Sequence, residues 1–214
     1  MPLSVSQTLS TNSESGSEPP SAFEIWEQVH RSKSWGTCPN EHMARFVKRH
    51  CEPYANILDI GCGLGANMDW LSLDYRVFGI DISPTAVDQA KRMHGWISKQ
   101  IQVVNATQLP FPDNEFDCVV DVCCLQHVDM VGIALNEAYR VLKPSGWIFS
   151  VMAAREHSDK AFPAGIYTHK LSSGIEPLAM LGDAGFTEAR NYYSTYEDEV
   201  HGWIAHWLTH GRKP

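Results

Sequence analysis

The sequence contains no long apolar run, no excess of positive charge and no closely spaced cysteine pair. Its longest apolar stretches reach about seven residues, whereas a membrane-spanning helix needs about twenty. Asp and Glu number 25 against 17 Lys and Arg, which gives a net charge of −8. Phosphate backbones bind basic surfaces, so this balance disfavours a nucleic-acid partner. None of the six cysteines forms a C-x-x-C motif, so we expect no metal site and no thioredoxin-type centre.

The first twenty residues hold no Lys or Arg and consist mostly of Ser, Thr, Pro and Glu. Secretory signals and mitochondrial presequences both need basic residues, so neither fits this segment. Its composition also buries too little apolar surface to offset the entropy lost on ordering. We therefore expect residues 1–20 to form a disordered tail on a cytoplasmic protein.

Capping signals predict where several helices begin. Ser21 and Glu24 have the spacing of a capping box, and Asn40 can cap a second helix. We expect these two helices, within residues 21–52, to form an N-terminal lid over a domain of residues 53–214. Ser83 can cap a further helix that begins with a proline. Its apolar residues recur at helical spacing and should be buried: Ala86, Val87, Ala90 and Met93.

Short apolar segments that alternate with helices predict the sheet. We expect strands at 56–60, 76–80, 102–105, 116–123, 147–153, 187–196 and 202–209. Such alternation is typical of a parallel sheet with helices on both faces. The last two segments are too close for a crossover helix and should form an antiparallel hairpin. The expected fold class is α/β, a doubly wound seven-stranded sheet that is mostly parallel.

A glycine-rich turn, I-L-D-I-G-C-G-L-G-A-N at 57–67, follows the first expected strand. Glycine allows a ligand to approach the backbone closely, and the helix that follows presents unpaired N–H groups. Gly61, Gly63 and Ala66 also satisfy the dinucleotide pattern G-x-G-x-x-G/A, so a nicotinamide cofactor stays open as an alternative.

Two acidic residues narrow the choice of ligand. Asp59 lies two residues before Gly61, where a carboxylate suits a ligand that carries a cation better than one that carries a pyrophosphate. Asp81 ends the second strand, where a carboxylate in this architecture meets a ribose diol. Each also has a structural alternative, because Asp59 could cap the turn and Asp81 could share a helix-capping role with Ser83.

Four segments, 57–67, 77–87, 105–128 and 137–151, resemble in order and spacing the successive motifs of the class I S-adenosylmethionine-dependent methyltransferases. The closest likeness is to their small-molecule, ubiquinone-methylase-like branch. The resemblance implies a Rossmann-like methyltransferase fold and S-adenosylmethionine as cofactor, with S-adenosylhomocysteine as product. It runs from about residue 26 to the C-terminus.

The resemblance also implies roles for individual residues. Asp59 would lie near the amino group of the cofactor, and Asp81 would hold its ribose hydroxyls. Asn105 stands where the family usually has an aspartate that accepts from the adenine amino group, a role its carbonyl could still fill. The other positions implied to contact the cofactor are Gly61, Gly63, Ile82, Ala106 and Val122.

Methyl transfer from a sulfonium needs positioning and exclusion of water, and a base only where the acceptor must lose a proton. His127 follows the fourth strand and could serve the acceptor side, or could be a packing histidine. Tyr167 lies in the long connection 154–173 and is a second candidate for the acceptor side. Trp35 could fold over the cofactor as part of the lid, or plug the edge of the sheet.

The leading hypothesis is a methyltransferase that acts on a small-molecule acceptor, as a monomer or homodimer, with no nucleic-acid or membrane partner. A nicotinamide-dependent oxidoreductase that uses the same glycine turn is the first alternative. A non-catalytic cofactor-binding protein is the second.

Overall fold

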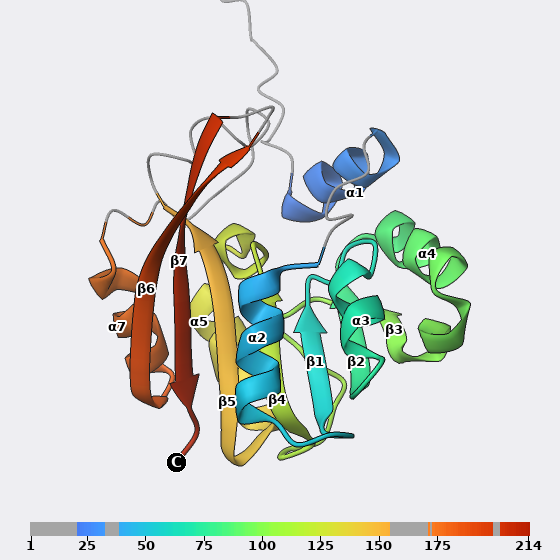
Figure 1. The fold of residues 1–214 in the computed structure, drawn as a ribbon. Helices are drawn as coiled ribbons and strands as arrows, with labels where there is room; N and C mark the ends of the chain where they lie inside the picture. The colour runs from blue at the N-terminus through green and yellow to red at the C-terminus, as the bar shows by residue number, and fades with distance from the viewer. Residues whose placement is uncertain (1–20, 33–38, 155–170, 172, 199–201) are drawn as a thin grey trace, which may run out of the picture.

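The computed structural model describes residues 21–32, 39–154, 171, 173–198 and 202–214. The tail predicted at residues 1–20 lies outside the described residues. Within them, seven strands form one sheet in the order β3-β2-β1-β4-β5-β7-β6 (Figure 1). The strands are β1 (Asn56–Ile60), β2 (Arg76–Asp81), β3 (Ile101–Val103), β4 (Phe116–Val122), β5 (Leu142–Ala153), β6 (Thr187–Asp198) and β7 (Gly202–Arg212).

The strands β1 to β5 pair in parallel, and β7 pairs antiparallel with both β5 and β6. The predicted α/β class and the terminal antiparallel hairpin are therefore confirmed. Because β1, β2 and β4 are neighbours, the residues that follow these three strands meet at the carboxyl edge of the sheet. This is the edge where ligands bind in doubly wound folds.

Helices cover both faces of the sheet (Figure 1). One face packs against α2 (Glu41–His50), α3 (Ala66–Leu71) and α4 (Pro84–Met93), and the other against α5 (Val131–Val141) and α7 (Ile175–Asp183). Along β1, Ile57 faces the first layer while Leu58 and Ile60 face the second, the alternation that a pleated strand requires. The remaining helical elements are α1 (Ala22–Ser32) and the 3₁₀ turns η1 (Gly95–Gln100) and η2 (Leu125–His127).

The predicted helix caps are present. Ser21 and Glu24 bond to each other reciprocally at the start of α1. Asn40 Oδ1 accepts from the Met43 N–H at 2.9 Å, and Ser83 Oγ accepts from the third residue after it at 3.1 Å. The prediction that Met93 is buried is wrong, because its side chain is 55% exposed. Met93 keeps the helical period, but the buried residues of α4 are Ala86, Val87 and Ala90 only.

Several strand boundaries differ from the prediction, among them those of β3 and β5. β3 ends at Val103 and not at residue 105, because its partner β2 ends at Asp81, whose carbonyl accepts the last ladder bond, from the Val104 N–H at 2.9 Å. β5 begins at Leu142, directly after α5, and Leu142 pairs with Phe116. The register then shifts before Cys118, so residues 143–146 form an irregular part of the strand instead of a separate turn.

The two N-terminal helices have different positions. α1 lies above the carboxyl ends of the parallel strands (Figure 1). α2 lies along the sheet, and its Met43 and Val47 are fully buried in the core. Among the described residues of the segment 21–52, α1 is therefore the part placed over the carboxyl edge, and its role as a lid stays a prediction.

Candidate functional site

The glycine turn connects β1 to α3 at the carboxyl edge. Gly61, Gly63 and Gly65 all have positive φ, at 71°, 52° and 83°, a region that side chains other than glycine rarely adopt. At Gly61 a Cβ would lie 2.3 Å from the Cβ of Cys124, so the turn also needs glycine to pass the chain that follows β4. The predicted glycine positions are thus fixed by backbone shape and by close approach of two segments.

Asp59 is a fully buried acid at this edge. Its side chain is 0% exposed, and neither carboxyl oxygen has a hydrogen-bond partner among the described residues. Burial raises the pKa of Asp59 well above its usual range, the carboxyl groups of Asp121 and Asp81 raise it further, and the Asn67 side-chain amide lowers it in part. A capping role for Asp59 finds no support, since a cap would place an N–H on one of these oxygens.

Asp81 ends β2 and bonds the glycine turn directly. One carboxyl oxygen accepts from the Gly63 N–H at 3.0 Å and the other from the Ser83 N–H at 2.9 Å. Ser83 itself caps α4, so the capping function does not depend on Asp81. Burial raises the pKa of Asp81, while these two N–H groups and the His30 imidazole lower it in part.

Asp121, near the end of β4, is a third buried acid that the sequence analysis missed. One oxygen accepts from the N–H groups of Cys124 and Leu125, both at 2.9 Å, and the other accepts from the Ser150 hydroxyl. Burial raises the pKa of Asp121 to about 6, against the effect of these hydrogen bonds. The side chain of Asp121 therefore fixes the turn after β4. The predicted Val122, the last residue of β4, is half-buried.

The positions predicted for the adenine lie after β2 and β3. Ile82 is half-buried and Ala106 is buried. Asn105 is exposed, and its Oδ1 accepts from the Thr107 N–H at 3.0 Å and from the Thr107 hydroxyl at 2.9 Å. An amide oxygen has two lone pairs, so both are already engaged by this local turn.

Helix α1 contributes groups to the site that the sequence analysis did not identify. Glu27, 9% exposed, accepts from the Ser83 hydroxyl at 2.6 Å and from the Thr85 N–H at 3.2 Å at the start of α4. Although burial acts to raise the pKa of Glu27, these bonds, the Thr85 hydroxyl and the Arg31 charge lower it to about 2. A buried charge with four such partners fastens α1 to the carboxyl edge.

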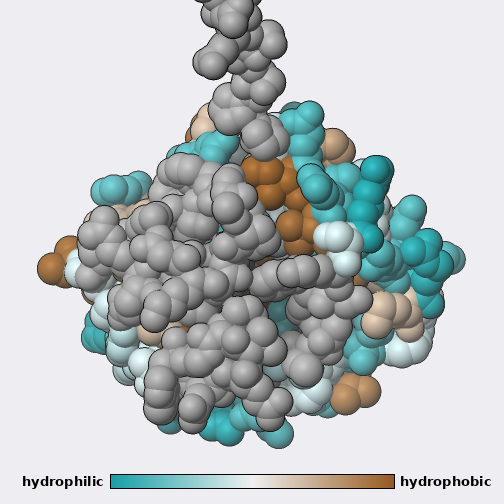
Figure 2. Space-filling model, turned by 90° about the horizontal axis from the view of Figure 1, so that it is seen from above, coloured by the Kyte–Doolittle hydropathy of each residue, from teal (hydrophilic) through white to brown (hydrophobic). Residues whose placement is uncertain are grey.

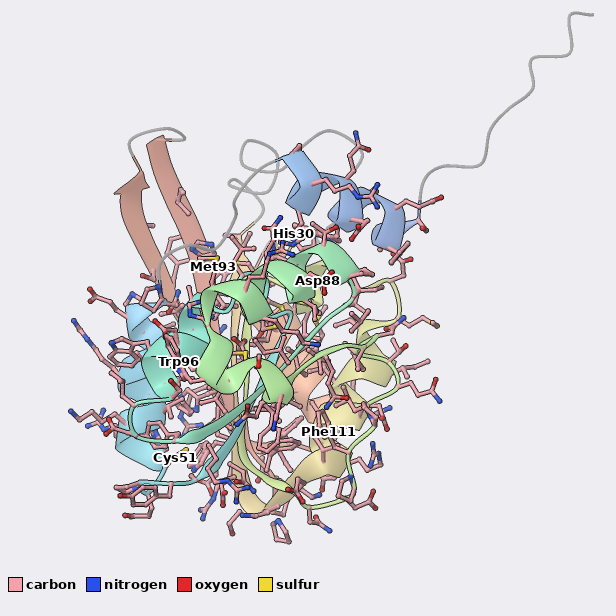
Figure 3. All side chains as sticks on the ribbon, turned by 90° about the vertical axis from the view of Figure 1, so that its right-hand side faces the viewer. His30, Cys51, Asp88, Met93, Trp96 and Phe111 are labelled. Carbon is pink, nitrogen blue, oxygen red and sulfur yellow. The ribbon has the colours of Figure 1, made fainter. Side chains whose placement is uncertain are left out.

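Two further side chains of α1 are directed toward the site. His30 is buried below the helix (Figure 3), and its Cε1 lies 3.8 Å from where a Cβ of Gly63 would be. Its Nδ1 is buried with no hydrogen-bond partner among the described residues. Burial lowers the pKa of His30, and the Asp81 charge opposes this. Trp26, one helical turn earlier, packs edge-on against His127, with ring centroids 4.8 Å apart.

His127, the predicted acceptor-side residue, belongs to η2 and is 4% exposed. Its Nε2 lies 3.0 Å from the side-chain nitrogen of Gln126. The structure thus brings together His127, Trp26 and the acids of the carboxyl edge. Trp35 and Tyr167, the other two predicted residues, lie outside the described residues. From above, apolar side chains (brown) are exposed beside polar ones (teal) at this edge (Figure 2).

Residues 58–150 match the family model of a methyltransferase domain. Over these residues the chain is therefore similar to methyltransferases. Over 144 residues it is 31% identical to a demethylmenaquinone methyltransferase of Symbiobacterium thermophilum, a match that covers 64% of this chain and 56% of that relative. The chain therefore spans about half the length of this curated relative.

Solved structures share the fold of this chain at low sequence identity. An S-adenosylmethionine-dependent methyltransferase of Methanosarcina mazei is 21% identical, with a TM-score of 0.66 over 78% of this chain and 96% of that one. The [4+2]-cyclase SpnF is 20% identical, with a TM-score of 0.68 over 91% and 97%. At these identities the likeness shows the fold, which does not by itself specify a reaction.

The part of the chain that the structure describes contains neither a metal-binding cluster nor a membrane-spanning helix. There, no three His, Cys, Asp or Glu side chains are grouped so that they could hold a metal ion. Nor does any of its helices have the length and apolar character needed to span a membrane.

Proposed function

We propose that the protein transfers the methyl group of S-adenosylmethionine to a small-molecule acceptor. The observation that carries this proposal is the buried, unpartnered carboxyl of Asp59 between Asp81 and Asp121. Buried acids destabilise one another and raise each other's pKa unless a cation compensates them. S-adenosylmethionine has two cationic groups, an ammonium and a sulfonium, and the orphaned oxygens of Asp59 fit the ammonium.

The other residues at the edge fit the remaining parts of this cofactor. Each carboxyl oxygen of Asp81 has one backbone donor and can accept further hydrogen bonds, so Asp81 suits the ribose diol. Gly61 and Gly63 leave room for the methionine part, beside Val122. For the adenine we assign Ile82 and Ala106, described above. Asn105 has the weakest role, because its Oδ1 would have to give up a bond from Thr107.

When bound, S-adenosylmethionine supplies a methyl group made electrophilic by the sulfonium charge. The chain itself contributes placement and exclusion of water. His30 and Trp26, held by α1, cover the carboxyl edge, and His127 marks its acceptor side. We propose Tyr167 as a second acceptor-side residue and Trp35 as part of the cover over the cofactor.

A small acceptor agrees with the net charge of −8 and with the demethylmenaquinone for which the curated relative is named. The acidic balance disfavours a nucleic-acid acceptor. We propose a cytoplasmic monomer or homodimer without a membrane partner.

Calorimetric titration of the full chain with S-adenosylmethionine and, separately, with NADH tests the proposal. We expect S-adenosylmethionine to bind and NADH not to bind; the reverse result would establish the oxidoreductase alternative. Asp81→Ala should weaken S-adenosylmethionine binding by about 1–3 kcal/mol, the cost of losing a charged hydrogen-bond partner. Asp88→Ala, an exposed acid on α4 (Figure 3), is the matched control and should leave binding unchanged.

Incubation with methyl-labelled S-adenosylmethionine and pools of small metabolites then identifies the acceptor. Transfer of label to a metabolite supports the proposal. Tight binding of S-adenosylmethionine without transfer to any pool would instead favour the non-catalytic alternative.

A further inference from the structure

β5 extends further along the sheet than its neighbour β4. The chain leaves β4 at Cys123, which has a positive φ of 60°, and the Cys123 N–H makes the last backbone bond to β5, at Val151, at 2.8 Å. Ala153 lies two residues further on, so its N–H faces a position where β4 offers no carbonyl. A buried N–H without a partner costs about 1–3 kcal/mol, so this group needs an acceptor.

Gln126, from the 3₁₀ turn η2, supplies that acceptor. Its side chain is 0% exposed, and its Oε1 accepts the hydrogen bond from the Ala153 N–H. An N–H can bond only to the amide oxygen, so this contact fixes which end of the Gln126 amide is oxygen and which is nitrogen. The nitrogen end must then point away from β5.

That nitrogen lies 3.0 Å from Nε2 of His127. An amide nitrogen donates and does not accept, so Nε2 of His127 must be the acceptor and can carry no proton. A histidine without a proton on Nε2 is neutral and carries its proton on Nδ1. The end of β5 therefore determines, through one glutamine, the protonation of a histidine at the site.

We propose that Gln126 is a positioning residue that locks His127 in the neutral Nδ1–H form. A further step rests on the proposed function. In this form Nε2 cannot remove a proton from the methyl acceptor. The acceptor is then a nucleophile that brings its own lone pair, without deprotonation by Nε2.

The tautomer is measured by long-range ¹H–¹⁵N NMR on the ¹⁵N-labelled full chain at neutral pH, without cofactor. The His127 signals are assigned by their loss in His127→Asn. We expect a protonated, pyrrole-type signal for Nδ1 and an unprotonated, pyridine-type signal for Nε2. A protonated Nε2 in the wild-type chain overturns the proposal, whatever the variants do.

Gln126→Glu tests the cause. A carboxylate keeps an acceptor for the Ala153 N–H but offers His127 a second acceptor in place of a donor, so Nε2 should gain a proton. The matched control, Gln108→Glu, makes the same chemical change at an exposed position and should leave the His127 signals unchanged. If Gln126→Glu folds, as judged by its backbone spectrum, and Nε2 still lacks a proton, Gln126 does not set the tautomer.

The catalytic step is tested by two isosteric variants, once an acceptor is known. The amide nitrogen of Asn overlaps Nδ1 of histidine, and that of Gln overlaps Nε2. We expect His127→Gln, which puts a donor where Nε2 accepts from Gln126, to lose at least tenfold in the transfer rate and His127→Asn to lose less; the opposite order overturns this step. Because the NMR result needs neither cofactor nor turnover, failure of the proposed methyl transfer leaves the tautomer assignment standing.

Discussion

The pKa values of acidic side chains are shifted in opposite directions at the two ends of the parallel strands. At the carboxyl end, Asp59, Asp81 and Asp121 are buried side by side, and the pKa of each is raised. At the amino end, Glu137 forms an ion pair with Arg140 at 2.7 Å, and hydrogen bonds from Arg140 lead the effects that lower its pKa. The acid at the amino end is paired with a cation of the same chain. Among the described residues, no such cation is paired with the acids at the carboxyl end, so a cationic ligand could compensate their charge.

The amino end also shows what compensation requires. The Arg140 guanidinium donates to two acids, Glu137 and Asp113, and to the carbonyls of Leu109 and Phe111. At the carboxyl edge, backbone N–H groups donate to Asp81 and Asp121 in place of a guanidinium. Among the described residues, neither a guanidinium nor a backbone N–H donates to Asp59. We infer that the amino end contributes stability, and that the carboxyl end gives up stability in exchange for affinity.

Arg140→Met should have the largest effect, lowering the free energy of unfolding by about 3 kcal/mol, because it leaves partly buried acceptors without a donor. Urea unfolding measures this loss. Arg45→Met is the control, since Arg45 and Glu41 form an exposed pair and should contribute less than about 0.5 kcal/mol. Calorimetry should show unchanged S-adenosylmethionine affinity in both variants. Weakened binding in Arg140→Met would contradict the inference that the amino end contributes to stability and not to ligand binding.

Asp59→Asn should act in the opposite direction, raising the stability of the ligand-free protein by about 2 kcal/mol at pH 7, because a buried charge is replaced by a neutral amide. Since the pKa of Asp59 is raised in the folded state, the wild-type chain loses stability as pH rises above the usual carboxyl pKa of about 4. The advantage of the variant should therefore shrink as pH falls toward 4.

Urea unfolding at several pH values gives this comparison, and calorimetry should show weaker S-adenosylmethionine binding by Asp59→Asn. Asp88→Asn, an exposed acid, is the control. A variant that is destabilised at every pH would mean that Asp59 is already compensated within the chain.

Glu27→Gln should weaken S-adenosylmethionine binding by about 1–2 kcal/mol, because a neutral amide holds α1 to the start of α4 less strongly than a carboxylate. Glu24→Gln is the control: Glu24 is exposed and belongs to the capping box, where Gln also serves. Calorimetry on both variants decides. Equal affinity in the two would show that attachment of α1 through Glu27 does not contribute to cofactor binding.

Lys143→Met should have the smallest effect, below about 1 kcal/mol in stability. Lys143 bonds Asp117 at 2.8 Å, but both side chains are partly exposed, at 41% and 35%, and solvent screens such pairs. Urea unfolding measures the change. A loss comparable to that of Arg140→Met would mean that the whole amino end acts as one network.

Local features of the chain were predictable, whereas contacts between distant segments were not. The caps at Ser21, Asn40 and Ser83 and the glycine turn depend on residues within a few positions of each other, and the structure contains all of them. The ends of β3 and β5 depend on pairing with other strands, and both were misplaced. The exposure of Met93 depends on what packs against the end of α4, which helical period does not show.

The same distinction applies to the site. Asp59 and Asp81 could be identified because they lie at fixed distances from the glycines. His30 and Trp26 could not, because their role depends on where α1 lies relative to a turn more than thirty residues away. Their spacing of four, with Glu27 between them, indicated only a shared helix face. Gln126 carried no signal, since its function follows from the difference in length between two strands.

Helix α1 contacts both halves of the site. His30 faces Gly63 and Asp81, on the side proposed for the cofactor, while Trp26 packs on His127, on the side proposed for the acceptor. Because both side chains belong to one rigid helix, a displacement of α1 changes both contacts together. Occupancy of one half is thus energetically linked to the geometry of the other, and such linkage acts with equal strength in both directions.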